Sequence, residues 1–173
     1  MGDLITINFY YFLRGGEYTK PSSIKLNGWV VHTTRTRQLQ VWDIGFWKDG
    51  KILPRHSPLE RLLTADSATM KIYNQNNGHM LQTIYHKSKG PRGALTALAC
   101  RVSHIMIHGV TEDHLLCDYF QTKTWELLQS SDIVDAVREA SKNPKLQEQV
   151  INPELIGEHS LRAGGATTLN IMG

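Results

Sequence analysis

Hydrophobic positions divide the first third of the chain into a helix, a strand and an irregular region. Residues 4–13 are apolar on nearly all sides, which predicts a buried helix, and Gly15-Gly16 predicts its end. Residues 24–31 alternate loosely between apolar and polar side chains, so we predict a strand there. Residues 33–58 mix basic, aromatic, Gly and Pro residues and indicate an excursion, and residues 58–63 fit a short helix.

Two further strand-like runs flank a turn signal. Residues 69–73 and 81–86 are separated by a segment that contains Asn76-Asn77-Gly78. Asn and Gly both accept a positive φ, which the tight turns of hairpins require. The pattern therefore predicts an antiparallel β-hairpin.

The remaining apolar residues recur at helical spacing. Ser130-Ser131-Asp132 offers N-cap oxygens to the second of two longer helices, Pro153 can open a short turn, and residues 161–172 fit a last helix. We predict one domain over residues 1–173, mainly α with a small three-stranded antiparallel sheet, an α+β fold. The periodic positions of the two longer helices are Leu95, Leu98, Val102, Ile105 and Met106, and then Ile133, Val134, Val137 and Ala140.

Composition restricts the function only weakly. The chain has 40% hydrophobic and 20% charged residues and a formal charge of +3, which permits a polyanionic partner. No apolar run approaches the length of a membrane span, so we expect no membrane partner. Cys100 and Cys117 make no disulfide framework, which favours an intracellular protein.

Two segments carry candidate chemistry, Leu13-Arg14-Gly15-Gly16-Glu17 and His159-Ser160-Leu161-Arg162-Ala163-Gly164-Gly165. His159 and Arg162 are three residues apart and would share one face at the start of the predicted last helix. The arginine fork matches phosphate oxygens, and a helix N-terminus favours an anion. Either segment alone is more simply a solvated or ion-paired group, but two arginines and a histidine together suit a phosphodiester under attack.

The two segments resemble the first-arginine and His-x-x-Arg motifs of the tyrosine recombinases, the phage-integrase superfamily. The longer run from His159 to Thr167 is most similar to recombinases of eukaryotic DIRS and Crypton mobile elements. The resemblance implies the catalytic core of that family, with duplex DNA and further recombinase protomers as partners, no cofactor and no metal. It also implies a nuclear location if the host is eukaryotic.

The resemblance also implies a role for each matched residue. Arg14 and Arg162 would clamp the scissile phosphate, His159 would assist proton transfer, and Glu17 would steady Arg14. In the family a tyrosine attacks to form a 3′-phosphotyrosine, so that strands are cleaved and rejoined without an external energy source. These roles make DNA recombination or integration the expected function.

The hairpin departs from the family. Asn76 stands where the family has a lysine that protonates the leaving 5′-oxygen, and an amide cannot act as that acid. Lys71, Lys87 and Lys89 are possible substitutes, although none fits the turn.

The nucleophile is a second departure. The family's tyrosine lies downstream of its second arginine, whereas all six tyrosines of this chain precede His159 and are more simply core or interface aromatics. We therefore expect that these residues alone do not cleave DNA. An alternative is a decayed or repurposed recombinase fragment that acts only as a DNA-binding module.

Two other features point to different chemistry. His104, His108, Asp113 and His114 are spaced closely enough to suggest a metal hydrolase, with polar-face histidines as the default interpretation. Basic residues of 33–37, together with Trp42, Phe46, Trp47, Lys48 and Lys51, could instead follow a nucleic-acid backbone or form an ordinary solvated loop.

Overall fold

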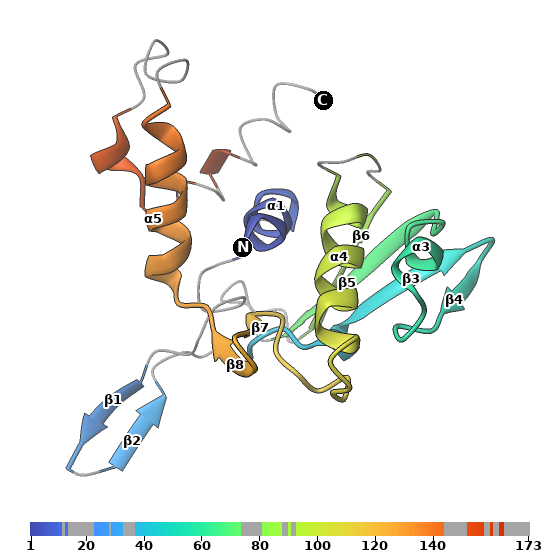
Figure 1. The fold of residues 1–173 in the computed structure, drawn as a ribbon, viewed down its shortest axis with the longest axis horizontal. Coiled ribbons are helices and arrows are strands. Elements are labelled where there is room, and N and C mark those ends of the chain that lie inside the picture. The colour runs from blue at the N-terminus through green and yellow to red at the C-terminus, as the bar shows by residue number, and fades with distance from the viewer. Residues whose placement is uncertain are drawn as a thin grey trace.

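The computed structural model describes most of the chain. The described residues are 1–11, 13, 23–27, 29–32, 37–73, 81–87, 90, 93–143, 152–157, 160 and 163–164. Within them the fold is mixed α+β, as predicted, but it is not mainly α, because eight strands occur beside four α-helices (Figure 1). No helix in this part of the chain combines the length and apolar character needed to cross a bilayer.

The central sheet has four antiparallel strands in the order β4-β3-β5-β6. The strands are β3 (Ile44–Lys48), β4 (Lys51–Leu53), β5 (Ser67–Tyr73) and β6 (Leu81–His86). Strands β5 and β6 confirm the predicted hairpin, with Tyr73 opposite Leu81.

The prediction of a three-stranded sheet that included residues 24–31 was wrong. That segment forms a separate hairpin of β1 (Ser23–Leu26) and β2 (Trp29–His32), in which Asn27 adopts a φ of 51°. The strand beside β5 is β3, from the region predicted to be an excursion. Asp49 and Gly50 connect β3 to β4 with φ angles of 49° and 73°, which is the geometry that Asp-Gly hairpin turns favour.

A third hairpin interrupts the part predicted to be helical. Strands β7 (Asp118–Gln121) and β8 (Thr124–Leu127) pair antiparallel around Thr122 and Lys123, both with positive φ. Neither residue is typical of that conformation, so the turn left no sequence signal.

The predicted helices are present at most of the expected positions. They are α1 (Gly2–Tyr11), α3 (Leu59–Leu62), α4 (Ala94–Met106) and α5 (Ser130–Ser141), with short 3₁₀ turns η1 (Val41–Asp43) and η2 (Pro153–Leu155). The N-cap of α5 is Gln129 rather than the predicted serines: its backbone N–H donates to the Asp132 carboxylate over 2.8 Å.

Within the described part of the chain, helices cover one face of the central sheet, and the other face carries exposed side chains. Helix α4 packs on β5 and also against α1, which lies between α4 and α5 in Figure 1. Alternate residues of the strands point into this core, including Phe46, Met70 and Ile72, all fully buried. The opposite face carries Trp47, Thr69, Lys71 and other partly or fully exposed residues.

Candidate functional site

The first motif follows helix α1. Leu4, Ile7 and Tyr11 recur at helical spacing, and all are buried against the core. Leu13, the first residue of the motif, is also buried at 1% exposure. Arg14 and Glu17 lie outside the described residues.

The second motif follows a segment that is held to α5. Arg138 Nε donates a 3.0 Å hydrogen bond to the carbonyl of Ile156, directly after η2. The next turn is closed by two hydrogen bonds: Gly157 N–H donates to Ser160 Oγ, and Ser160 N–H donates to the Gly157 carbonyl. Ser160, which lies inside the His-x-x-Arg motif, is therefore hydrogen-bonded to Gly157 through both its side chain and its backbone.

The described residues of this motif are helical. Ser160, Ala163 and Gly164 have helical conformation, in line with the predicted last helix. His159 and Arg162 lie outside the described residues, so their side chains have no assigned position here.

The two motif regions meet at a contact between helix α1 and Gly164. A Cβ atom added to Gly164 would lie 3.8 Å from Phe9 Cε2, an ordinary van der Waals distance. Phe9 precedes Arg14 by five residues, and Gly164 follows Arg162 by two. The structure thus brings together the neighbours of both motifs, although they come from opposite ends of the sequence.

The hairpin position Asn76 also lies outside the described residues, as does Lys89. Lys71 and Lys87 are described, and neither occupies the turn. Lys71 is exposed within β5, opposite Thr83, and Lys87 directly follows β6.

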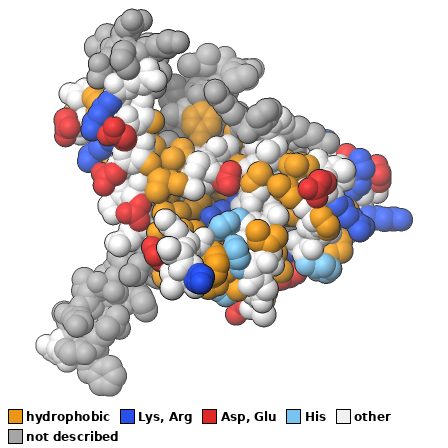
Figure 2. Space-filling view, in the orientation of Figure 1, with side chains coloured by type: hydrophobic (Ala, Val, Ile, Leu, Met, Phe, Trp, Pro, Cys, Tyr) orange, Lys and Arg blue, Asp and Glu red, His pale blue; other side chains and the backbone are white. Residues whose placement is uncertain are grey.

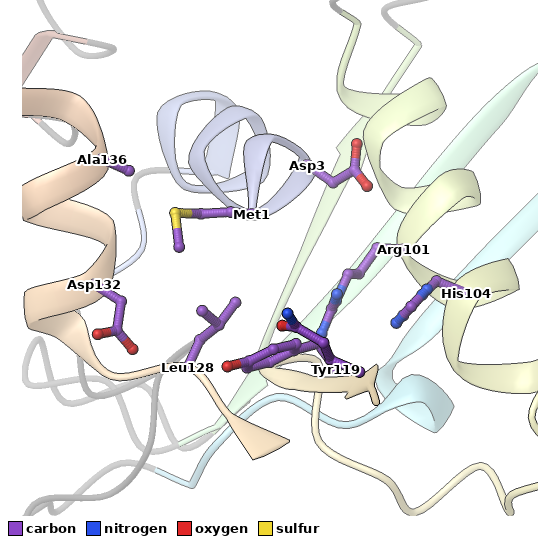
Figure 3. A pocket seen from close by; sticks show the side chains of 9 residues that line it. Met1, Asp3, Arg101, His104, Tyr119, Leu128, Asp132 and Ala136 are labelled. Carbon is purple, nitrogen blue, oxygen red and sulfur yellow. The ribbon is translucent and has the colours of Figure 1, made fainter. Parts of the chain in front are cut away.

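A cleft of about 700 Å³ is a candidate binding space among the described residues (Figure 3). It opens between α1, α4, α5 and the β7–β8 hairpin. Its lining mixes charged, polar and apolar side chains, namely Met1, Asp3, Arg101, His104, Tyr119, Gln121, Leu128, Asp132 and Ala136.

Arg101 lies at the inner wall of this cleft and is only 3% exposed. Its Nε donates to the Leu116 carbonyl over 2.5 Å, and its Nη2 donates to the Asp118 carbonyl. The guanidinium thereby joins α4 to the loop that leads into β7. Burial lowers the pKa of Arg101, so the site is costly for a charge, and two backbone acceptors offset that cost.

The cleft is poorly suited to a phosphate. Two of the Arg101 nitrogens are already engaged by carbonyls, and two carboxylates, Asp3 and Asp132, line the same space. Tyr119 donates to Glu126 over 2.6 Å and adds no cation. An anion would meet these carboxylates, so the cleft is not a second phosphate clamp.

The histidines suggested as metal ligands have other partners. His104 Nε2 accepts the Phe120 backbone N–H over 3.1 Å, and His114 Nδ1 lies 2.9 Å from Asp118 Oδ2. The His108 ring packs on the Phe120 ring with centroids 4.1 Å apart. Figure 2 shows His side chains gathered between α4 and the β7–β8 hairpin.

No group of three potential metal ligands occurs among the residues that the structure describes, and these include His104, His108, Asp113 and His114. Their geometry favours ring packing and hydrogen bonding around the hairpin. This finding removes the support for the metal-hydrolase alternative.

The basic and aromatic residues of the 33–58 region divide between the core and the surface. Phe46 is fully buried in the core, so its ring is not available to a nucleic acid. Trp42 is 51% exposed and Trp47 is partly exposed. Lys48 lies 3.4 Å from Asp66, and residues 33–36 are outside the described part.

The sequence interpretation missed two arginines that organise the structure. Arg101 lies among the apolar residues that predicted a helix, so it was not considered as a site residue. Arg55 follows a proline in residues 33–58, which were predicted to be an excursion. Arg55 donates to the Ile44 and Trp42 carbonyls and to Glu112. A basic residue inside an apolar period, as at Arg101, was the one available signal.

Comparisons with protein-family models, with curated proteins and with solved structures found no match.

Proposed function

We propose that this chain is the catalytic region of a tyrosine recombinase and binds duplex DNA around one scissile phosphate. Arg14 and Arg162 grip that phosphate, His159 moves a proton beside it, and Glu17 steadies Arg14. The observation that supports the proposal is the approach of Gly164 to Phe9, because each residue is a close neighbour of one motif.

Chain connectivity turns this contact into an argument about the arginines. A polypeptide spans at most about 3.5 Å per residue. Arg162 therefore lies no farther from Gly164 than two residues of chain can reach, and Arg14 no farther from Phe9 than five residues can reach. A phosphodiester that is attacked in line concentrates negative charge on its equatorial oxygens. Two arginine forks directed at one such group provide the electrostatic stabilisation that cleavage requires.

The secondary structure between the motifs is compatible with the resemblance. The family implies a small antiparallel sheet with a hairpin between the two arginines, and β3, β5 and β6 supply an antiparallel arrangement at that place in the sequence. Strand β4 is an addition at the outer edge of β3.

Cleavage needs two groups that residues 1–173 lack at the family's positions. None of the six tyrosines follows Arg162, so the attacking tyrosine must come from outside these residues. The amide of Asn76 cannot protonate the leaving 5′-oxygen. We therefore propose DNA binding for residues 1–173, and strand transfer when a tyrosine and an acid are supplied by further sequence or by another protomer.

The second candidate function is a DNA-binding module that has lost cleavage altogether. Asn76 favours it, because the amide replaces the family's lysine, and the leaving 5′-oxygen then has no residue at that position to protonate it. Either function implies an intracellular protein that meets DNA, in the nucleus if the host is eukaryotic.

A double-mutant cycle on duplex binding tests the shared proposal. Arg14→Ala and Arg162→Ala should each weaken binding by about 1.5–3 kcal/mol, the range for hydrogen bonds to charged groups. Because both arginines grip one phosphate, the binding free energy lost in the double variant should be smaller than the sum of the two single losses. The difference should exceed about 0.5 kcal/mol. Arg61→Ala, at an exposed arginine of α3, is the matched control and should bind as the unaltered chain does. Additive losses, or none, would overturn the proposal.

The two functions differ in covalent chemistry. The recombinase is supported if a longer gene product forms a covalent bond between the 3′-phosphate of cleaved DNA and a tyrosine downstream of residue 173. A product that binds duplex DNA with the same arginine coupling but forms no covalent complex supports the binding module.

A further inference from the structure

The face of the central sheet that the described helices leave uncovered combines aromatic rings with cations. On β5 the exposed or half-exposed residues alternate with the core residues and are Thr69, Lys71 and Tyr73. Their partners on β6 are Tyr85, Thr83 and Leu81 in the same order. We call this surface the outer sheet face, and it also includes Trp47, Ile52, Arg37, Trp42 and Lys87.

Trp47 and Tyr85 form the first aromatic group of the outer sheet face. The Trp47 indole N–H donates to Thr69 Oγ1 over 3.0 Å, which holds the ring against the sheet. Gly45 provides the space, because a Cβ there would lie 3.2 Å from Trp47 Nε1. Tyr85 is opposite Thr69 and 54% exposed, and Lys87 Nζ lies 5.7 Å from its ring centroid.

Tyr73 and Trp42 form the second group, around Arg37. The Arg37 guanidinium carbon lies 4.0 Å from the Tyr73 ring centroid and 5.3 Å from that of Trp42. Arg37 also pairs with Asp43 over 2.6 Å, which fixes the cation between the rings. Lys71 lies in the row between the two aromatic groups, and those groups are four residues apart along β5, or about 14 Å.

The charges of this surface favour an anionic partner. Lys71 and Lys87 give this surface two net positive charges, because the charge of Arg37 is balanced by that of Asp43. Among the described residues beside them, Asp43 is neutralised by Arg37 and its side chain is only 2% exposed. Asp49 and Asp66 lie at the β3–β4 end, where Asp66 pairs with Lys48.

We infer that the outer sheet face binds unpaired nucleotides of a single-stranded nucleic acid. Bases stack on Trp47, Tyr85, Tyr73 and Trp42, and phosphates pair with Lys71 and Lys87. Aromatic rings on a sheet between cations suit unpaired bases, because every base presents a π-face and every linkage carries a negative charge. A duplex buries its base faces and cannot use the rings, so this surface differs from the proposed duplex site at Arg14 and Arg162.

Fluorescence anisotropy with labelled oligothymidylate of about 12 nucleotides tests the inference on the full chain. Tyr85→Ala should weaken binding about 5- to 150-fold, the range for loss of one stacked base. Lys71→Met should lower the slope of log affinity against log salt by about 0.7, the value for one phosphate contact on a single strand. Both side chains are exposed, so circular dichroism should show folded variants.

Matched controls separate this face from general surface effects. Ile107→Ala removes an exposed apolar side chain elsewhere, and Lys123→Met removes an exposed lysine from the β7–β8 turn. Both controls should bind oligothymidylate as the unaltered chain does. Oligouridylate in a parallel titration distinguishes RNA from DNA as the preferred strand. A duplex cannot use the rings, so it should bind Tyr85→Ala as tightly as it binds the unaltered chain.

Equal affinity of the unaltered chain, Tyr85→Ala and Lys71→Met for oligothymidylate would overturn the inference. If Tyr85→Ala instead abolished self-association in sedimentation and left oligonucleotide affinity unchanged, the face would be an interface between copies of this chain. Neither outcome depends on Arg14 or Arg162, so the duplex proposal stands or fails separately.

Discussion

The indole nitrogen of Trp47 donates a 3.0 Å hydrogen bond to Thr69 Oγ1, across the pairing of β3 with β5. The pair closes over Gly45, where an added Cβ would lie 2.7 Å from Thr69 Oγ1. That distance is shorter than van der Waals contact permits, so Thr69 or the indole would have to move. Gly45→Ala should therefore lower the free energy of unfolding by about 1–3 kcal/mol, the usual cost of overpacking.

Urea unfolding, followed by tryptophan fluorescence, checks this effect. The emission of the folded Gly45→Ala variant should also shift, because Trp47 loses its fixed position. Gly2→Ala is the matched control: a Cβ there meets nothing within 4 Å, and alanine favours the first turn of α1. Unchanged stability of Gly45→Ala would mean that Thr69 rotates away at little cost.

Arg101 offers a second prediction, about a buried cation held by backbone carbonyls. Arg101→Met keeps most of the apolar stem but leaves the Leu116 and Asp118 carbonyls without their donors. Each buried acceptor without a partner costs about 1–3 kcal/mol, so the variant should lose about 2–6 kcal/mol of unfolding free energy. A variant as stable as the unaltered chain would show that the cost of burying the charge cancels both hydrogen bonds.

The sequence predicted most helices because their apolar periods are long. Leu95, Leu98, Val102 and Ile105 repeat over several turns of α4, and the β5–β6 hairpin carried both alternation and an Asn-Gly turn. The β3–β4 hairpin has its own Asp49-Gly50 signal, but β4 is only three residues long and shows no alternation. The β7–β8 hairpin turns on Thr122 and Lys123, which carry no signal at all.

The candidate sites differ in how far the sequence could reveal them. Adjacent residues in a motif, such as Leu13-Arg14 or His159-Ser160, point to chemistry but not to which distant segment they meet. The approach of Gly164 to Phe9 depends on tertiary packing that no local pattern encodes. The outer sheet face also required the register of β5 with β3 and β6, because a shift of one residue would bury Lys71 and Tyr73.

Arg55 gives a third prediction, about an arginine that joins three segments. It donates to the Trp42 carbonyl over 2.8 Å, to the Ile44 carbonyl, and to Glu112 Oε2 over 2.7 Å. Arg55→Ala should cost about 1–3 kcal/mol, because one carbonyl in η1 and one at the start of β3 lose a charged donor. Glu112→Gln should cost less than about 1 kcal/mol, since that carboxylate is partly exposed and the backbone bonds remain. Equal losses in both variants, measured by urea unfolding, would assign the stabilisation to the ion pair instead.

His104 gives a fourth prediction, about pH. Burial lowers the pKa of His104, and the charge of Arg101, the neighbouring His108 and the N-terminal amine lower it further, while Asp3 acts in the opposite direction. The unfolded chain therefore takes up a proton near pH 6.5, whereas the folded chain takes it up only at lower pH. Protonation of Nε2 would also remove the acceptor of the Phe120 N–H. Stability should accordingly fall as the pH drops from about 7 through the lowered pKa of the folded state.

His86 contributes in the same direction, because burial lowers its pKa as well. His104→Gln keeps an acceptor for the Phe120 N–H but cannot titrate, so its unfolding free energy should depend less steeply on pH between about 7 and 5. The double variant with His86→Gln should be flatter still. Urea unfolding at several pH values measures these slopes. If His104→Gln followed the same slope as the unaltered chain, the folded protein would already protonate His104 like an exposed histidine, and the β7–β8 hairpin would not depend on the neutral ring.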